Sequence, residues 1–496
     1  MAEGPSVVPR HDPPRAACPE RMRIHSLVFG RRARDRSPRK FAGKESPLRA
    51  ELFGADQMER HGKSLAASHH LARERASGQL LARLAENEGV LTEVCDLLTA
   101  AVTANRRITP AAEWLLDNFY LIEDQIRTAK RHLPKGYSRE LPGLAHGASA
   151  RLPRVYDLAL EAISHGDGRV DGEGLTRFVA AYQTVSPLLL GELWAFPIML
   201  RLALIENLRR VGTRIAAGTI DRNRADAWAD RMMEVAEQDP KSLILVIADM
   251  ARSSPPMVSS FVAELARRLQ GQSPALALPL TWIEQRLFES GLTIEQLVQS
   301  ETQEQAGDQV SISNSIGSLR FLGSMDWSEF VEAMSFVEHK LREDPGGFYS
   351  EMDFATRDRY RHVVEQIARR SRFSEIDVAR KAIQLAHEGA ARAAGIGGRS
   401  DPASHVGFYL IDNGRPQLDR AVEMRIPLVD AATRVAGRSP LSLYLGAIAL
   451  ITGTLTGALL ANARAGGASG ALMVVIGALA LLATSQLAVA IVNWLA

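Results

Sequence analysis

The sequence predicts an all-α protein, a multi-helix cytoplasmic bundle followed by a two-helix transmembrane hairpin. Between residues 55 and 440, apolar side chains recur at helical spacing and strand-like alternation is nearly absent. The chain then ends in two long runs without a charged residue. We therefore expect four segments: a disordered basic tail (1–50), a cytoplasmic helical domain (51–440) and two transmembrane helices (441–463 and 471–495).

The first 50 residues have the composition of a disordered tail. They hold twelve Arg and Lys and many prolines, which together cannot form a buried core. A solvated tail is the favoured interpretation over one that touches anionic lipid or nucleic acid, and the net charge of +2 gives no support to a nucleic-acid partner. No apolar signal-peptide core follows the start, so we expect a cytoplasmic N-terminus. Cys18 and Cys95 do not suggest a disulfide framework.

The stretch "PAAEWLLDNFYLIEDQI" (110–126) is predicted to be one amphipathic helix. Thr109 can cap it, and Pro110 then occupies the first helical position, where its missing N–H costs nothing. Its two faces are given by residue spacing. One face is apolar and contains Trp114, Leu115, Phe119, Ile122 and Ile126; the other is polar and contains Glu113, Asp117, Tyr120, Asp124 and Arg127. Carboxylates on such a polar face are usually solvated, although the face could also dock onto a partner.

Further helical patterns follow along the chain. They cover residues 80–102, 191–218, 224–238, 256–270, 327–343 and 375–395. Breaks are expected at 133–154, 273–279 and 395–404, where Pro and Gly gather. A short extended piece at 405–418 could be a β-hairpin, because Asn413 and Gly414 form a turn signal.

The two C-terminal runs are predicted to cross a bilayer. Residues 441–463 and 471–495 contain no charge, and each run is long enough for a hydrocarbon core about 30 Å thick. Arg425, Arg434 and Arg438 precede the first run, which places residues 1–440 in the cytoplasm by the positive-inside rule. Gly453 and Gly457 form a small-xxx-small pair suited to close helix contact, which leaves a homo-oligomer open. Two buried helices of a soluble protein are the alternative.

Motifs of catalysis or metal binding were not found. "DGRVDG" (167–172) resembles a calcium loop, but Arg169 stands at its third position and Phe178 where a bidentate Glu is needed, so we expect a turn between helices. His69 and His70 are adjacent, which is poor geometry for one metal ion. No zinc-site spacing, Walker loop, dinucleotide fingerprint or nucleophile elbow occurs.

Several stretches resemble the N-terminal part of cyclic β-1,2-glucan synthases. They occur in the family's order and are residues 108–126, 133–142, 153–171, 190–210, 309–322, 352–368 and 405–415. The resemblance runs from about residue 55 to the end and includes the apolar hairpin. It implies an inner-membrane protein of Gram-negative bacteria, whose family uses UDP-glucose and a divalent metal in a cytoplasmic glucosyltransferase domain that follows the second span. That domain builds the glucan on the protein itself, and phosphorylase-like domains trim the polymer.

The sequence stops at "IVNWLA", where the family continues into the transferase domain. We therefore expect no catalytic, cofactor-binding or metal residues here, and a scaffold module that is inactive alone. Its expected partners are the lipid bilayer and a glucosyltransferase domain of the same or another chain. Candidate docking residues are Glu113, Asp117, Tyr120, Arg357, Arg359 and Arg361, although ion pairs would also explain the arginines.

Two alternatives to the scaffold module stay open. One is a stand-alone interaction or regulatory protein of the inner membrane. The other is an enzyme with its site in the 133–171 region, where Lys135, Tyr137, Arg139, His165 and Asp167 cluster in sequence.

Overall fold

A computed structural model of the protein describes residues 45–72, 74–134, 136–396, 402–424 and 440–495. In these ranges the regular structure is helical, and β-type pairing is limited to isolated bridges such as that between Leu71 and Leu144. The predicted all-α class is confirmed. The basic tail lies almost entirely outside the described residues.

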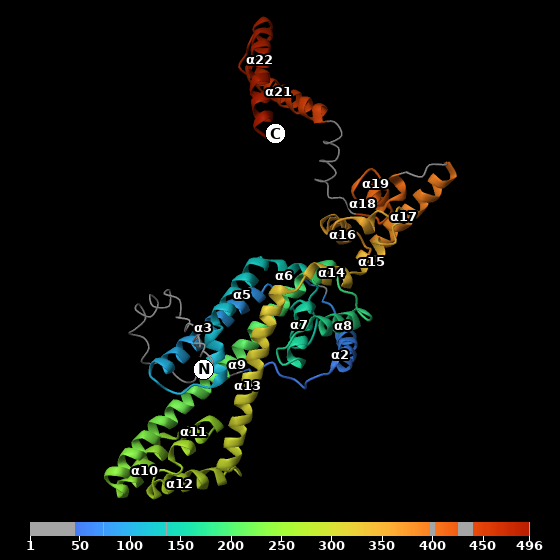
Figure 1. The fold of residues 1–496 in the computed structure, drawn as a ribbon. Helices are drawn as coiled ribbons and strands as arrows, with labels where there is room; N and C mark the ends of the chain where they lie inside the picture. Colours follow the sequence, from blue (N-terminus) through green and yellow to red (C-terminus); the bar gives the residue numbers. More distant parts are fainter. Residues whose placement is uncertain (1–44, 73, 135, 397–401, 425–439, 496) are drawn as a thin grey trace, which may run out of the picture. The chain divides into compact units, whose positions relative to one another are not determined.

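Two compact units divide the chain between His339 and Lys340, inside helix α15 (Phe336–Leu341). The predicted helical domain 51–440 thus extends over both units. The first unit is built around one long helix, α9 (Leu190–Gln238), against which α3, α5, α7, α11, α13 and α14 pack (Figure 1). The sequence suggested two helices here, but α9 runs continuously through residues 219–223.

The other helices of the first unit have these bounds: α2 Ala55–Ser68, α3 Leu80–Thr103, α4 Pro110–Asp117, α5 Phe119–His132, α6 Tyr137–Glu140, α7 Arg154–His165, α8 Gly172–Gln183, η2 Pro240–Ser242, α10 Leu243–Ser253, α11 Ser259–Leu269, η3 Pro274–Leu276, α12 Ala277–Phe288, α13 Ile294–Ser324 and α14 Trp327–Met334. Local signals set several of these starts. Thr293 caps α13 by accepting from Gln296 N at 3.2 Å, and the Gln296 side chain accepts from Thr293 N in return.

Two hydrophobic cores lie along α9. The first half of the helix, with Leu204 and Leu208, is buried against α3, α4, α5, α7 and α13. The second half, with Ala229 and Met232, is buried against α10, α11 and α12. Because one helix supplies both cores, it fixes the spacing between the two ends of the unit.

The predicted helix over 110–126 is broken at Asn118. The Thr109 cap is confirmed, since its hydroxyl accepts from Ala112 N at 3.3 Å. Asn118, however, leaves helical geometry (φ −108°, ψ 10°) and its side chain donates to Trp114 O at 2.8 Å, which separates α4 from α5. Leu115, on the predicted apolar face, is buried as expected, but Trp114 is 37% exposed, so its assignment to that face was wrong.

The second unit contains η4 Tyr349–Glu351, α16 Phe354–Arg369, α17 Glu375–Ile396, η5 Pro402–Ser404, α18 Val406–Ile411 and α19 Arg415–Ala421. The β-hairpin considered for 405–418 is wrong. Asn413 and Gly414 do form a turn, but it joins two short helices. Val406, Tyr409 and Leu410 are fully buried, and their three- and four-residue spacing gives α18 one apolar face.

The C-terminal runs form a helical hairpin of α21 (Pro440–Ala465) and α22 (Gly470–Leu495). Both helices are long and apolar enough to cross a membrane. The Thr456 and Thr484 hydroxyls lie 2.8 Å apart where the helices meet. Around Gly453 and Gly457 no described atom lies within 4 Å of where a Cβ would be, so this pair does not form the contact with α22.

Candidate functional site

The first predicted docking surface lies on α4 and α5. Glu113, Asp117 and Tyr120 are all exposed, as expected for the polar face. Glu113 and Asp117 also line an open groove of about 690 Å³, together with Arg106 and Arg107 from the loop before α4. The groove therefore presents charges of both signs.

The second predicted surface, on α16, is only partly at the surface. Arg359 is exposed and Arg357 is half-buried. Arg361 is 0% exposed, pairs with Asp358 at 3.0 Å and lies over the ring of Phe354 at 5.0 Å, so its assignment to a docking surface was wrong. Arg361 therefore contributes to packing inside the second unit.

The residues singled out in the 133–171 region differ in exposure, and Arg139 is at the surface. Lys135 lies outside the described residues. His165 and Asp167 are buried, and Asp167 accepts from Arg49 Nε at 3.1 Å. The Tyr137 hydroxyl donates to Gly191 O at 3.4 Å. These partners give Asp167 and Tyr137 a role in packing, and the enzyme alternative stays a hypothesis.

The expected turn within 167–172 is confirmed and is anchored to α13. Ser318 Oγ donates to Gly168 O at 2.8 Å and accepts from Val170 N at 2.8 Å. Gly168 has φ +79°, and a Cβ there would lie 2.4 Å from Ser315 Oγ, so only glycine fits. Asn207 Nδ2 of α9 donates to Ser315 Oγ at 3.1 Å. The turn thereby joins α7, α8, α9 and α13.

A buried carboxylate on α9 gathers several basic side chains. Glu206 is fully buried and accepts from Arg83 Nε at 3.0 Å and Nη2 at 2.8 Å, from Asn87 at 2.9 Å, from Arg209 at 2.9 Å and from Arg210 at 2.9 Å. Burial alone would raise the pKa of the Glu206 carboxyl, but the hydrogen bonds from Arg83 and Arg209 outweigh it and hold that pKa well below its ordinary value. The carboxylate stays ionised and ties α3 to α9.

A second buried pair joins the start of α7 to the start of α9. Arg154 is 3% exposed and Glu192 is 0% exposed. Arg154 Nε donates to Glu192 Oε1 at 2.7 Å and Nη2 donates to Oε2 at 2.6 Å, a bidentate arrangement. Such a desolvated pair fixes the register between two helices.

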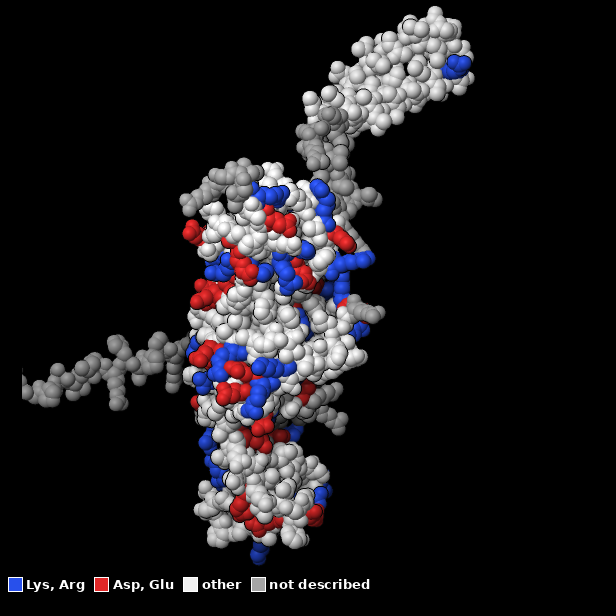
Figure 2. All heavy atoms as spheres, turned by 90° about the vertical axis from the view of Figure 1, so that its right-hand side faces the viewer, with Lys and Arg blue, Asp and Glu red and all other residues white. Residues whose placement is uncertain are grey.

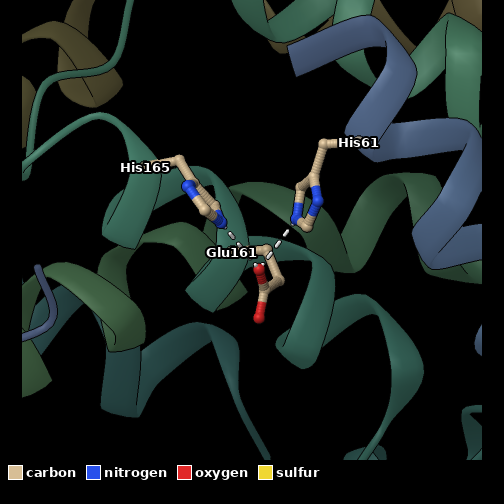
Figure 3. A group of neighbouring side chains, drawn as sticks. All are labelled: His61, Glu161 and His165. Carbon is tan, nitrogen blue, oxygen red and sulfur yellow. Dashed lines mark hydrogen bonds and ion pairs between the residues drawn. The ribbon is translucent and has the colours of Figure 1, made fainter. Parts of the chain in front are cut away.

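Two histidines and a carboxylate meet between α2 and α7. Figure 3 shows His61 and His165 pointing toward Glu161, whose Oε2 lies 2.8 Å from His61 Nε2 and 3.3 Å from His165 Nε2. One ligand atom from each of the three lies within 4.8 Å of the others, a spacing that could hold a metal ion. Sequence reasoning missed this group because His61 and Glu161 lie 100 residues apart. The only local signal was the four-residue step from Glu161 to His165, which puts both on one face of α7.

The apolar hairpin presents almost no charge. Figure 2 shows Lys, Arg, Asp and Glu interspersed over the helical units, whereas the hairpin is white except for one basic side chain. The last turn of α21 contains Arg464. Leu450, Val474 and Leu482 are among its exposed side chains. An apolar surface of this kind suits a lipid environment.

Comparison with known proteins identifies one relationship. No family model matches the chain. Over 379 residues the chain is 32% identical to the cyclic β-(1,2)-glucan synthase NdvB of Rhizobium meliloti (strain 1021). The chain is a homologue of cyclic β-1,2-glucan synthases. The match covers 76% of this chain but only 13% of the Rhizobium synthase, and it confirms the resemblance to the family's N-terminal portion.

Proposed function

We propose that this chain is the membrane-anchored N-terminal scaffold module of a cyclic β-1,2-glucan synthase. Glucosyl transfer from UDP-glucose, with its divalent metal, would be the work of a domain outside these 496 residues. The observation that carries the proposal is the match to the Rhizobium synthase over 379 residues. The helical architecture supports it, because the described buried charges have structural partners.

The proposed location is the inner membrane, with the helical units in the cytoplasm. The hairpin of two apolar helices, each long enough to cross a membrane, supports anchoring. The arginines at 425, 434 and 438 support the orientation through the positive-inside rule. With the exposed residues Glu113, Asp117, Tyr120 and Arg359, the module would contact the transferase domain.

Topology is tested by cysteine labelling in a Cys18→Ser background. Ser469→Cys, between the two helices, and Ser290→Cys, after α12, both replace exposed serines. In intact cells an outer-membrane-permeant but inner-membrane-impermeant maleimide should label Ser469→Cys and spare Ser290→Cys. Labelling of Ser290→Cys at the same rate contradicts the orientation.

Activity is tested with membranes that contain only this chain. We expect no transfer of label from UDP-[¹⁴C]glucose into glucan or protein, while membranes with the Rhizobium synthase serve as the positive control. Incorporation of label overturns the scaffold proposal.

The second candidate function is a stand-alone interaction or regulatory protein of the inner membrane. The mixed-charge groove beside Glu113 and Asp117 is the observation that favours it. Affinity purification of the full chain from its native membranes separates the two: recovery of a glucosyltransferase supports the scaffold, and recovery of unrelated partners without one supports the alternative.

A further inference from the structure

We propose that His61, Glu161 and His165 bind one divalent transition-metal ion of the zinc type. The three residues come from α2 and α7, and Figure 3 shows both imidazoles directed at the same carboxylate. This site would be separate from any metal of the transferase chemistry, so it does not rest on the proposed function.

The distances already approach a coordination sphere. Glu161 Oε2 lies 2.8 Å from His61 Nε2 and 3.3 Å from His165 Nε2, and one ligand atom from each of the three residues lies within 4.8 Å of the other two. Zinc bonds of about 2.0–2.2 Å place neighbouring ligands of a tetrahedron about 3.3–3.6 Å apart. Small side-chain rotations would therefore complete the site.

The hydrogen bond of His165 favours a metal at its other nitrogen. His165 Nδ1 lies 2.7 Å from Glu51 O, and because a carbonyl only accepts, Nδ1 carries the proton. Nε2, which lies 3.3 Å from Glu161 Oε2, is then the ring nitrogen that faces the proposed metal position. A backbone carbonyl on the distal nitrogen is also the usual way in which proteins orient a metal-binding histidine.

The surroundings hold the rings while leaving access. Phe53 stacks on His165 with ring centroids 3.9 Å apart and an angle of 9°. His61 and Glu161 are half-buried, so solvent can reach the cluster and water can supply a further ligand. Two imidazoles and one carboxylate suit zinc and its first-row neighbours, whereas magnesium and calcium prefer oxygen ligands throughout. A bound ion would clamp α2, α7 and the segment around Phe53 together.

The experiment titrates metal-stripped full-length chain in detergent with Zn²⁺ and Co²⁺. We expect one saturable site per chain, a Co²⁺ d–d absorption band and a higher unfolding temperature with Zn²⁺. Glu161→Gln, which preserves size and hydrogen bonding, should weaken binding at least about tenfold and remove the thermal shift, because it deletes the anionic ligand.

The matched control uses another histidine–carboxylate contact of the same region. His69 Nε2 lies 3.1 Å from Asp157 Oδ2, so His69→Ala removes a similar contact to α7 but no proposed ligand. It should lower stability without changing metal stoichiometry. X-ray absorption of the bound Zn²⁺, which needs no variant, should show scattering from two imidazoles and no sulfur.

Three results would overturn the proposal. They are the absence of saturable binding by the unaltered chain, binding that Glu161→Gln leaves unchanged, and an absorption spectrum with sulfur or oxygen ligands alone. In each case the cluster would be a hydrogen-bonded group without a metal ion.

Discussion

Replacing Arg154 by methionine tests the role of the buried charges in the first unit. The side chain makes two hydrogen bonds to Glu192 and one each to Ser186 Oγ and Pro187 O, the latter two at 2.7 Å. Burial would lower the pKa of Arg154, but the hydrogen bonds and charge of Glu192 outweigh it and raise that pKa. Methionine fills much of the same volume and leaves Glu192 without its counter-charge.

The expected cost follows from that unpaired charge. Removing one partner of a buried ion pair destabilises by about 3–5 kcal/mol. Since each 1.4 kcal/mol is about tenfold in an equilibrium constant, the equilibrium constant for local opening of α7 and the start of α9 should rise by between about two and four powers of ten. Arg154→Met with Glu192→Gln should recover much of this loss, because glutamine carries no charge and can still accept from Leu189 N, now at 2.9 Å.

Hydrogen exchange with mass spectrometry on the full chain in detergent measures this opening. Peptides from α7 and from the start of α9 should exchange faster by the stated factor, and peptides from α12 should not change. Arg286→Met is the control, since Arg286 and Glu289 are 58% and 61% exposed and such a pair contributes at most about 1 kcal/mol. If Arg154→Met speeds hydrogen exchange in α7 and α9 no more than Arg286→Met speeds it in α12, the reasoning is refuted.

Three further predictions concern single contacts. Because the pKa of Glu206 is held low, its ionised carboxylate stabilises the fold above the unfolded pKa of about 4.3, and this stabilisation is lost as pH falls below that value. Glu206→Gln should therefore flatten the acid-induced loss of hydrogen-exchange protection in α3. An unchanged acid profile would contradict this. Hydrogen bonding of the His362 ring N–H to the Asp358 carboxylate raises the pKa of His362 to about 9. The contribution of this contact to stability is therefore complete below about pH 6.5 and is lost as pH rises through about 9. NMR of labelled histidine should show this titration, and Asp358→Asn should return the pKa toward 6.5. The double variant Thr456→Val, Thr484→Val should weaken the association of α21 with α22 by about 0.6–2 kcal/mol. Energy transfer between labels on the two helices during SDS denaturation measures this loss. No change would mean that the 2.8 Å contact between the two hydroxyls is not stabilising.

Local patterns were sufficient for much of the fold. The apolar spacing that predicts Leu115 and Ile122 inside, and the cap at Thr109, act within one or two turns, so the sequence displays them directly. The hairpin was predictable because a charge-free run is itself the physical requirement for burial in hydrocarbon.

Errors arose where distant contacts decided the outcome. The break at Asn118 depends partly on Arg320 of α13, which donates to the Asn118 side chain. Arg361 was expected at the surface because charge usually is, yet Asp358 and Phe354 provide it with a buried environment.

The candidate sites divide in the same way. Glu113, Asp117 and Tyr120 could be placed at the surface from helix spacing alone. The group of His61, Glu161 and His165 could not be predicted, because it exists only after α2 packs near the end of α7.

The most direct test of the central claim is a chimera of the Rhizobium synthase in which this chain replaces the matching N-terminal segment. Synthesis of cyclic β-1,2-glucan from UDP-glucose is measured in membranes that contain equal amounts of chimera and unaltered synthase. The scaffold account predicts that the chimera makes the cyclic glucan, and that removal of residues 441–495 from it abolishes synthesis. A chimera that inserts into the membrane in full amount but makes no glucan would contradict the account.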